Sequence, residues 1–259
     1  MMSKVETKVE RKSESKIERK PEVKVEKKME SGEGESQRKE VVEWYEVFDP
    51  NLINLVYGKA GAGKTRLAIA IAKRNVEMGR DVIYISTELN NDPLIDSIRK
   101  FVTEVMTIYK PYDVFNTLKR MVIEPGDVII IDSLGGIREN WISFYGRGNL
   151  SDTAPTNRLI ANIVHILALK WVLTKRQIKV VLITHESPSV GKLWHGEDGA
   201  PTTAQHSIHD VSMVVRIVMR ENYDETGELV SVERIGRVVM DRYNVIGAGK
   251  IFYLPQPII

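Results

Sequence analysis

The sequence predicts an α/β fold: a mostly parallel central sheet with helices on both faces, followed by C-terminal β-hairpin strands. Apolar runs rich in Val and Ile alternate with helical patterns up to about residue 184, which is typical of βαβ units. Continuous apolar runs are typical of parallel strands that are covered on both faces. After residue 210, strand-like runs follow one another across a turn, as in hairpins. With 42% hydrophobic residues among 259, the chain can bury one good-sized core.

The first predicted strand, residues 52–57, leads into a phosphate-binding motif. The next eight residues read G-K-A-G-A-G-K-T and precede a helical pattern, so the motif lies in its expected strand–loop–helix setting. In such a loop, backbone N–H groups surround a phosphate, Lys64 reaches the β- and γ-phosphate oxygens, and the Thr65 hydroxyl occupies a Mg²⁺ position. We therefore predict that ATP and Mg²⁺ bind here, at Gly58, Lys59, Ala60, Gly61, Ala62, Gly63, Lys64, Thr65 and Arg66.

Two carboxylates follow predicted strands. The run 127–131 ends at Asp132, which we predict as the residue that orients the Mg²⁺ water shell. The strand at 82–86 places Glu88 at its C-terminal end, where open α/β sheets gather their ligands. There Glu88 can act as the base that polarises water for attack on the γ-phosphate, with Lys64 as its catalytic partner. The alternatives are that Asp132 is an ordinary strand-terminal residue and that Glu88 only caps the following loop.

The remaining elements follow from periodicity and turn signals. Asp92-Pro93 predicts the start of a helix that runs to about Tyr109, and a second helix is expected over 112–122. An apolar stripe predicts a helix over 156–174, and a buried strand is expected over 179–184. Further strands are expected over 212–220, 229–241 and 250–254, with a turn at 224–227.

The first 40 residues form a charged repeat. Lys recurs every four residues from Lys4 to Lys28, with Glu two residues after each, and Pro21 interrupts the series. On a helix this spacing stacks like charges, so we predict a disordered, extended segment over residues 1–40 and a folded domain over 41–259. The segment is interpreted either as a tether for a partner or DNA, or as a solubilising extension.

Composition excludes several classes. The chain has no cysteine, so disulfides and thiolate metal sites are excluded, and a cytoplasmic location is expected. No long uncharged apolar stretch or leader-like segment is present, so a membrane protein is not expected. Residues 1–40 carry 12 Lys/Arg and 10 Asp/Glu, so the remaining residues carry 25 of each. With a neutral core, any DNA binding has to come from local basic loops.

The segment after Asp132 resembles the archaeal RadA recombinases and their eukaryotic counterparts. It contains Ile137-Arg138 and then Tyr145-Gly146-Arg147-Gly148-Asn149-Leu150, similar to an F-R segment and a G-R-G-x-L run in that family. The resemblance implies an archaeal RecA-type P-loop NTPase core over roughly 52–254. It also implies that Glu88 activates water and that Arg138 and Arg147 contact DNA.

The chain also departs from that family. The charged repeat stands in place of the family's N-terminal helix-hairpin-helix domain, and no convincing F-x-x-A motif precedes the core. The family's T-N-Q sensor is replaced by Thr184-His185-Glu186. An ionised Glu186 cannot donate a hydrogen bond, so His185 is the candidate for contacting the γ-phosphate. The turn-rich segment 188–201 stands at the family's second DNA-binding loop. Lys192 and Trp194 offer a cation and a ring to single-stranded DNA, although Glu197 and Asp198 argue against this.

These observations predict an ATP hydrolase resembling RadA paralogues, which acts in recombination and DNA repair by binding single-stranded DNA or the recombinase. A homo-oligomer is compatible with this prediction. The alternative is a KaiC-like signalling ATPase with protein partners, which the neutral core and the replacement by Glu186 favour. A non-catalytic nucleotide-binding module is a third class.

Overall fold

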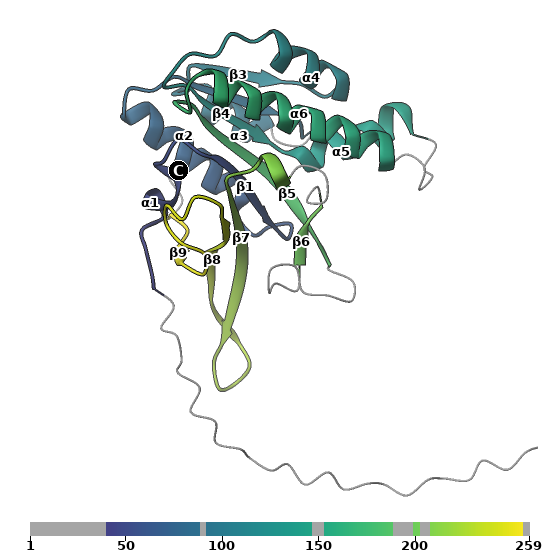
Figure 1. Ribbon diagram of the computed structural model, residues 1–259. Coiled ribbons are helices and arrows are strands. Elements are labelled where there is room, and N and C mark those ends of the chain that lie inside the picture. Colours follow the sequence, from purple (N-terminus) through teal and green to yellow (C-terminus); the bar gives the residue numbers. More distant parts are fainter. Residues whose placement is uncertain (1–39, 89–91, 147–152, 189–198, 203–207, 256–259) are drawn as a thin grey trace, which may run out of the picture. The chain divides into compact units, whose positions relative to one another are not determined.

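A computed structural model describes residues 40–88, 92–146, 153–188, 199–202 and 208–255. The predicted disordered segment, except its last residue, and the predicted DNA contacts Arg147, Lys192 and Trp194 lie outside these ranges, so those predictions stay predictions. The described elements are shown in Figure 1. In chain order they are α1 (Trp44–Phe48), β1 (Ile53–Gly58), α2 (Lys64–Glu77), β2 (Val82–Ser86), α3 (Asp92–Ile98), β3 (Glu104–Thr107), α4 (Pro111–Arg120), β4 (Val128–Asp132), α5 (Leu134–Tyr145), α6 (Thr153–Leu173), β5 (Lys179–Pro188), β6 (Gly199–Pro201), the 3₁₀ turn η2 (Ile208–Asp210), β7 (Met213–Tyr223), β8 (Leu229–Asp241) and β9 (Ile251–Tyr253).

The strands form one sheet in the order β3-β2-β4-β5-β1-β7-β8-β9, with β6 paired to β5. The strands from β3 to β7 in this order run parallel, whereas β8 pairs antiparallel with both of its neighbours, β7 and β9. This arrangement confirms the predicted RecA-type core with a C-terminal hairpin. Because the central strands are parallel, their carboxyl ends meet at one edge of the sheet, where such folds bind ligands.

Helices cover both faces of the sheet. Helices α4, α5 and α6 contact one another on one face, and α2 packs on the other face, against β1, β2, β4 and β5 (Figure 1). The four central strands are buried along nearly their whole length, which explains their continuous apolar runs. Each fully buried Val, Leu or Ile side chain stabilises the fold by about 1.5–3 kcal/mol relative to an exposed one.

The structure corrects one prediction between β2 and β4 and adds one helix after β4. The helix expected up to Tyr109 ends at Ile98, and Glu104–Thr107 forms β3, paired in parallel with β2. Here the hydrogen-bonding edge of β2 outweighs a local pattern that also fits a helix. Conversely, the segment after Asp132 forms the helix α5, which the sequence did not predict because its first turn contains Gly135 and Gly136, both weak helix formers.

Candidate functional site

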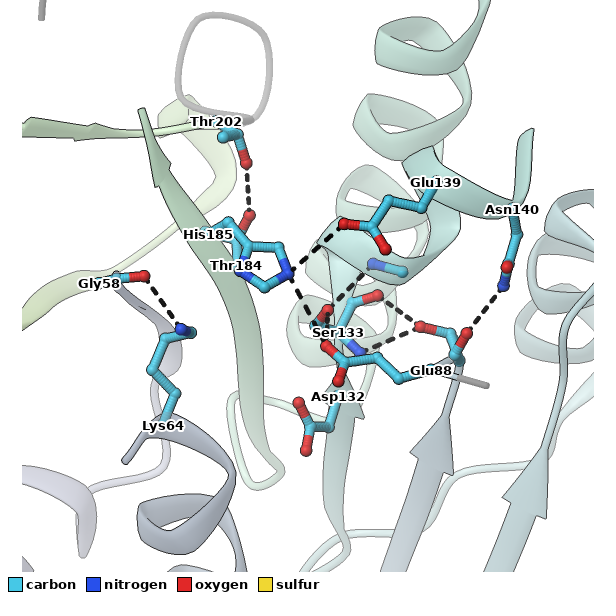
Figure 2. Close-up of polar contacts among 12 residues, drawn as sticks. Gly58, Lys64, Glu88, Asp132, Ser133, Glu139, Asn140, Thr184, His185 and Thr202 are labelled. Atoms are coloured by element: carbon cyan, nitrogen blue, oxygen red, sulfur yellow. Dashed lines mark hydrogen bonds and ion pairs between the residues drawn. The ribbon is translucent and has the colours of Figure 1, made fainter. Parts of the chain in front are cut away.

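The phosphate-binding motif connects the end of β1 to the start of α2. Gly61 and Gly63 adopt positive φ angles of 75° and 99°, a conformation that favours glycine. The Lys64 side chain is buried and folds back over the loop, where its Nζ donates to the carbonyl oxygen of Gly58 at 2.9 Å (Figure 2). It also donates to the carbonyl oxygen of Lys59 at 2.8 Å. Burial lowers the pKa of Lys64, while the charges of Glu88 and Asp132 raise it. Two carbonyl oxygens of the loop therefore hold the Lys64 ammonium group in place.

Asp132 ends β4 and is fully buried. The Tyr84 hydroxyl of the neighbouring strand β2 donates to its Oδ2 at 2.7 Å. Burial raises the pKa of Asp132 to about 6, against the opposing effect of the Tyr84 hydrogen bond. Its Oδ1 is buried, and a side-chain contact with Thr65, the other predicted Mg²⁺ residue, lowers the pKa of the carboxyl. A buried acceptor of this kind, close enough to Lys64 to affect its pKa, fits a carboxylate that orients the water shell of Mg²⁺.

Glu88 lies two residues beyond β2, at the same edge of the sheet. The Ser133 hydroxyl donates to Glu88 Oε1 at 2.6 Å, and the Gly136 backbone N–H donates to Ser133 Oγ at 3.0 Å (Figure 2). Ser133 is thus both the N-cap of α5 and the residue that holds the Glu88 carboxylate.

The loop that carries Glu88 is fixed by two further side chains. The Thr87 hydroxyl donates to the Ser133 carbonyl oxygen at 2.6 Å, and the buried Asn140 amide donates to the Thr87 carbonyl oxygen at 2.7 Å. Gly136 is required here because a Cβ atom at its position would lie 2.6 Å from Thr87 Oγ1. The roles of Ser133, Thr87 and Asn140 were not predictable from the sequence, because their contacts join segments about 50 residues apart.

His185 lies beside this group. Its backbone pairs with Gly58 of β1, and its Nε2 lies 3.9 Å from an oxygen of Glu88 and 3.9 Å from an oxygen of Glu139 on α5 (Figure 2). The imidazole packs where a side chain at Gly135 would stand. The structure therefore brings the predicted phosphate contact His185 together with the predicted base Glu88.

The neighbouring Glu186 has a different partner. Its side chain forms a buried ion pair with Arg216 of β7, with Oε1 2.8 Å from Nη2 and Oε2 3.2 Å from Nε. Because β1 lies between β5 and β7, this pair bridges the end of β1. A hydrogen-bonded pair of this kind explains how an acid is accommodated at the family's glutamine position.

Of the four predicted DNA contacts, only Arg138 lies within the described residues. Arg138 lies half-buried on α5, one residue before Glu139. Helix α5 ends at Tyr145, so the segment that carries Arg147 begins where the helix stops.

Comparison with known proteins finds a sequence similarity to a RadB protein. No protein-family model matches the chain. Over 150 residues it is 25% identical to the DNA repair and recombination protein RadB of Methanococcoides burtonii. The match covers 54% of this chain and 63% of that protein, so it spans less than two-thirds of the relative's length. The chain thus resembles the RadA/RadB-like proteins of the RecA superfamily. None of the helices in the described ranges combines the length and the apolar character that a membrane span requires.

Proposed function

We propose that this chain is an ATPase of recombinational DNA repair that uses bound ATP to control its binding to single-stranded DNA or to the recombinase. The observation that supports this proposal most directly is the meeting of Lys64, Asp132 and Glu88 at one edge of the sheet, from three different strands and loops. Similarity to RadB supports the cellular process.

In this proposal each residue has a definite task. The backbone N–H groups of the loop from Gly61 to Thr65 hold the phosphates, and Lys64 exchanges its bonds to two carbonyl oxygens for bonds to the β- and γ-phosphates. Thr65 and Asp132 hold Mg²⁺, which when bound neutralises charge on the phosphate oxygens. Glu88, oriented by Ser133, accepts the proton of the attacking water. His185 contacts the γ-phosphate next to Glu88.

The DNA-facing part of the proposal rests on the resemblance and on position. Arg138 and Arg147 lie on or just after α5, whose first turn is bonded to Glu88 through Ser133. Lys192 and Trp194 are proposed as further contacts, through charge and base stacking.

Two variants test the catalytic assignment. Lys64→Ala is expected to abolish ATP binding or turnover, because it removes the cation that holds the β- and γ-phosphates. Glu88→Gln is expected to retain Mg·ATP and to lower kcat by about 10²- to 10⁴-fold, because only the base is lost. The measurements are ATP affinity and steady-state hydrolysis, with Glu77→Gln at the exposed end of α2 as a control. Normal turnover in Glu88→Gln would sink the assignment.

Filter binding of single-stranded DNA, with and without ATP, tests the cellular role. We expect binding that depends on ATP. If the protein hydrolyses ATP but retains no DNA at low salt, the KaiC-like alternative with protein partners replaces the recombination proposal.

A further inference from the structure

An arginine of the C-terminal hairpin, Arg234 of β8, lies against the phosphate-binding loop. A Cβ atom at Gly63 would lie 2.9 Å from Arg234 Cδ and 3.4 Å from its Nε. The carbonyl oxygen of Arg234 accepts a hydrogen bond from the backbone N–H of Leu254, which fixes the strand at this point. Gly63 therefore has two reasons to be glycine: its φ of 99° and the space that it leaves for this side chain.

A second arginine converges on the same place. Arg66 belongs to the first turn of α2, and its Nε is shielded from solvent without a hydrogen-bond partner. Burial and the positive charge of Arg234 both lower the pKa of Arg66, so the two guanidinium groups are close enough to repel each other. In the described part of the chain, neither arginine has a carboxylate within ion-pair distance. Two adjacent cations and an unsatisfied donor make a site that an anion would complete.

The sheet order indicates which anion this is. Glu88 follows β2 and Asp132 ends β4, on one side of β1, whereas Arg234 belongs to β8, on the other side. A polyphosphate whose terminal phosphate faces the carboxylates therefore directs its opposite end toward β8. In phosphate-binding loops the backbone holds the α- and β-phosphates while the lysine reaches the β- and γ-phosphates.

We propose that Arg66 and Arg234 clamp the α-phosphate of the bound nucleotide. This inference rests on the proposed ATP site, and it adds a residue from β8 that is distant in sequence from the motif. The clamp acts equally on di- and triphosphates, since both carry the α-phosphate. It therefore sets nucleotide affinity without distinguishing ATP from ADP.

The test compares Arg234→Ala and Arg66→Ala with Arg220→Ala, an exposed arginine on the same hairpin. Affinities for Mg·ATP, Mg·ADP and inorganic tripolyphosphate are measured by calorimetry, and thermal melting checks folding. We expect each clamp variant to weaken all three ligands by a common factor of about tenfold, the scale of one hydrogen bond to a charged group, with partial recovery in Arg234→Lys. Arg220→Ala should bind like wild type.

Three outcomes overturn the clamp. A loss confined to ATP would place the arginines at the γ-phosphate, and a loss for both nucleotides without one for tripolyphosphate would place them at the base or sugar. Unchanged affinity in both variants would remove them from the site. Failure of the underlying ATP site looks different, because wild type would then bind no nucleotide or Lys64→Ala would bind as well as wild type.

Discussion

Ser133 shows how much of this site depends on one hydroxyl group. Its oxygen accepts from the Gly136 N–H, so its hydrogen is available to point at Glu88 Oε1. Loss of that hydrogen bond removes one constraint on how the carboxylate is oriented toward the proposed attacking water. Ser133 is therefore a positioning residue for the proposed base.

We expect Ser133→Ala to lower kcat by about tenfold or more, since a hydrogen bond to a charged group contributes about 1.5–3 kcal/mol. The affinity for Mg·ATP should change much less, because the hydroxyl does not belong to the phosphate loop. Single-turnover hydrolysis and equilibrium binding separate the two effects, with Ser133→Thr as a partial rescue. Ser143→Ala, which removes an exposed hydroxyl of α5, is the control. If Ser133→Ala melts earlier but hydrolyses normally, the serine is only a helix cap.

Sequence reasoning found the residues whose chemistry is local. The loop around Lys64 and the strand that ends in Asp132 carry their signal within a few neighbouring positions, so both were predictable. Ser133 and Asn140 carry no such signal, because they matter only through contacts with the loop at Thr87 and Glu88. The buried ion pair of Glu186 was also missed, since it needs the knowledge that β7 lies two strands from β5.

At the scale of elements, β5 begins with an unusual residue. Lys179 is fully buried, and its Nζ donates to Asn75 Oδ1 of α2 at 2.8 Å. Burial lowers the pKa of Lys179 to about 7, and the nearby Arg80 acts in the same direction. The folded protein thus holds a lysine that loses its proton far more readily than it does in the unfolded chain.

This difference predicts a pH dependence of stability. Between pH 7 and about 10.4, the ordinary pKa of lysine, the unfolded chain binds a proton that the folded chain has released, so stability rises with pH by up to about 1.4 kcal/mol per unit. Below pH 7 both states are protonated and the full cost of the buried charge remains. Lys179→Met should remove this slope and raise the free energy of unfolding at pH 7. Urea unfolding at pH 7 and 9 measures it, with exposed Lys119→Met as the control; equal slopes in Lys179→Met and wild type would contradict it.

Element boundaries show where sequence patterns stop being sufficient. The strands β1, β2, β4 and β5 were predicted because burial on both faces leaves long apolar runs. Strand β3 was missed because its four residues are only partly buried and its pairing with β2 is not encoded locally. Helix α5 was missed because its glycines serve close packing against His185 and Thr87, which overrides their low helix propensity.

At the scale of the whole molecule, charge balance limits how DNA can be bound. Residues 41–259 carry equal numbers of basic and acidic residues, so no general attraction to a polyanion is expected. DNA binding in the proposed role has to come from a few local cations, so replacing any one of them should measurably lower the affinity for DNA.

Arg147→Ala should therefore weaken binding of single-stranded DNA and reduce the dependence of log K on log salt by about 0.7, the contribution of one phosphate contact to a single strand. Affinity measured between about 50 and 200 mM salt gives this slope. Arg99→Ala, which removes an exposed arginine paired with Asp96, should leave the slope unchanged. An identical slope for both variants would remove Arg147 from the interface.

Helix α5 has a consequence for regulation. Its first turn is hydrogen-bonded to Glu88 through Ser133. Its last residue, Tyr145, lies at the other end of the helix, about 18 Å from the first turn at 1.5 Å per residue, and precedes Arg147 in the sequence. If the proposed DNA ligand moves α5 as a unit by binding at its C-terminal end, we expect the Glu88 carboxylate to move with it through Ser133. In the proposed function, thermodynamic linkage then requires reciprocity: the factor by which bound ATP raises the affinity for that ligand equals the factor by which the ligand raises the affinity for ATP.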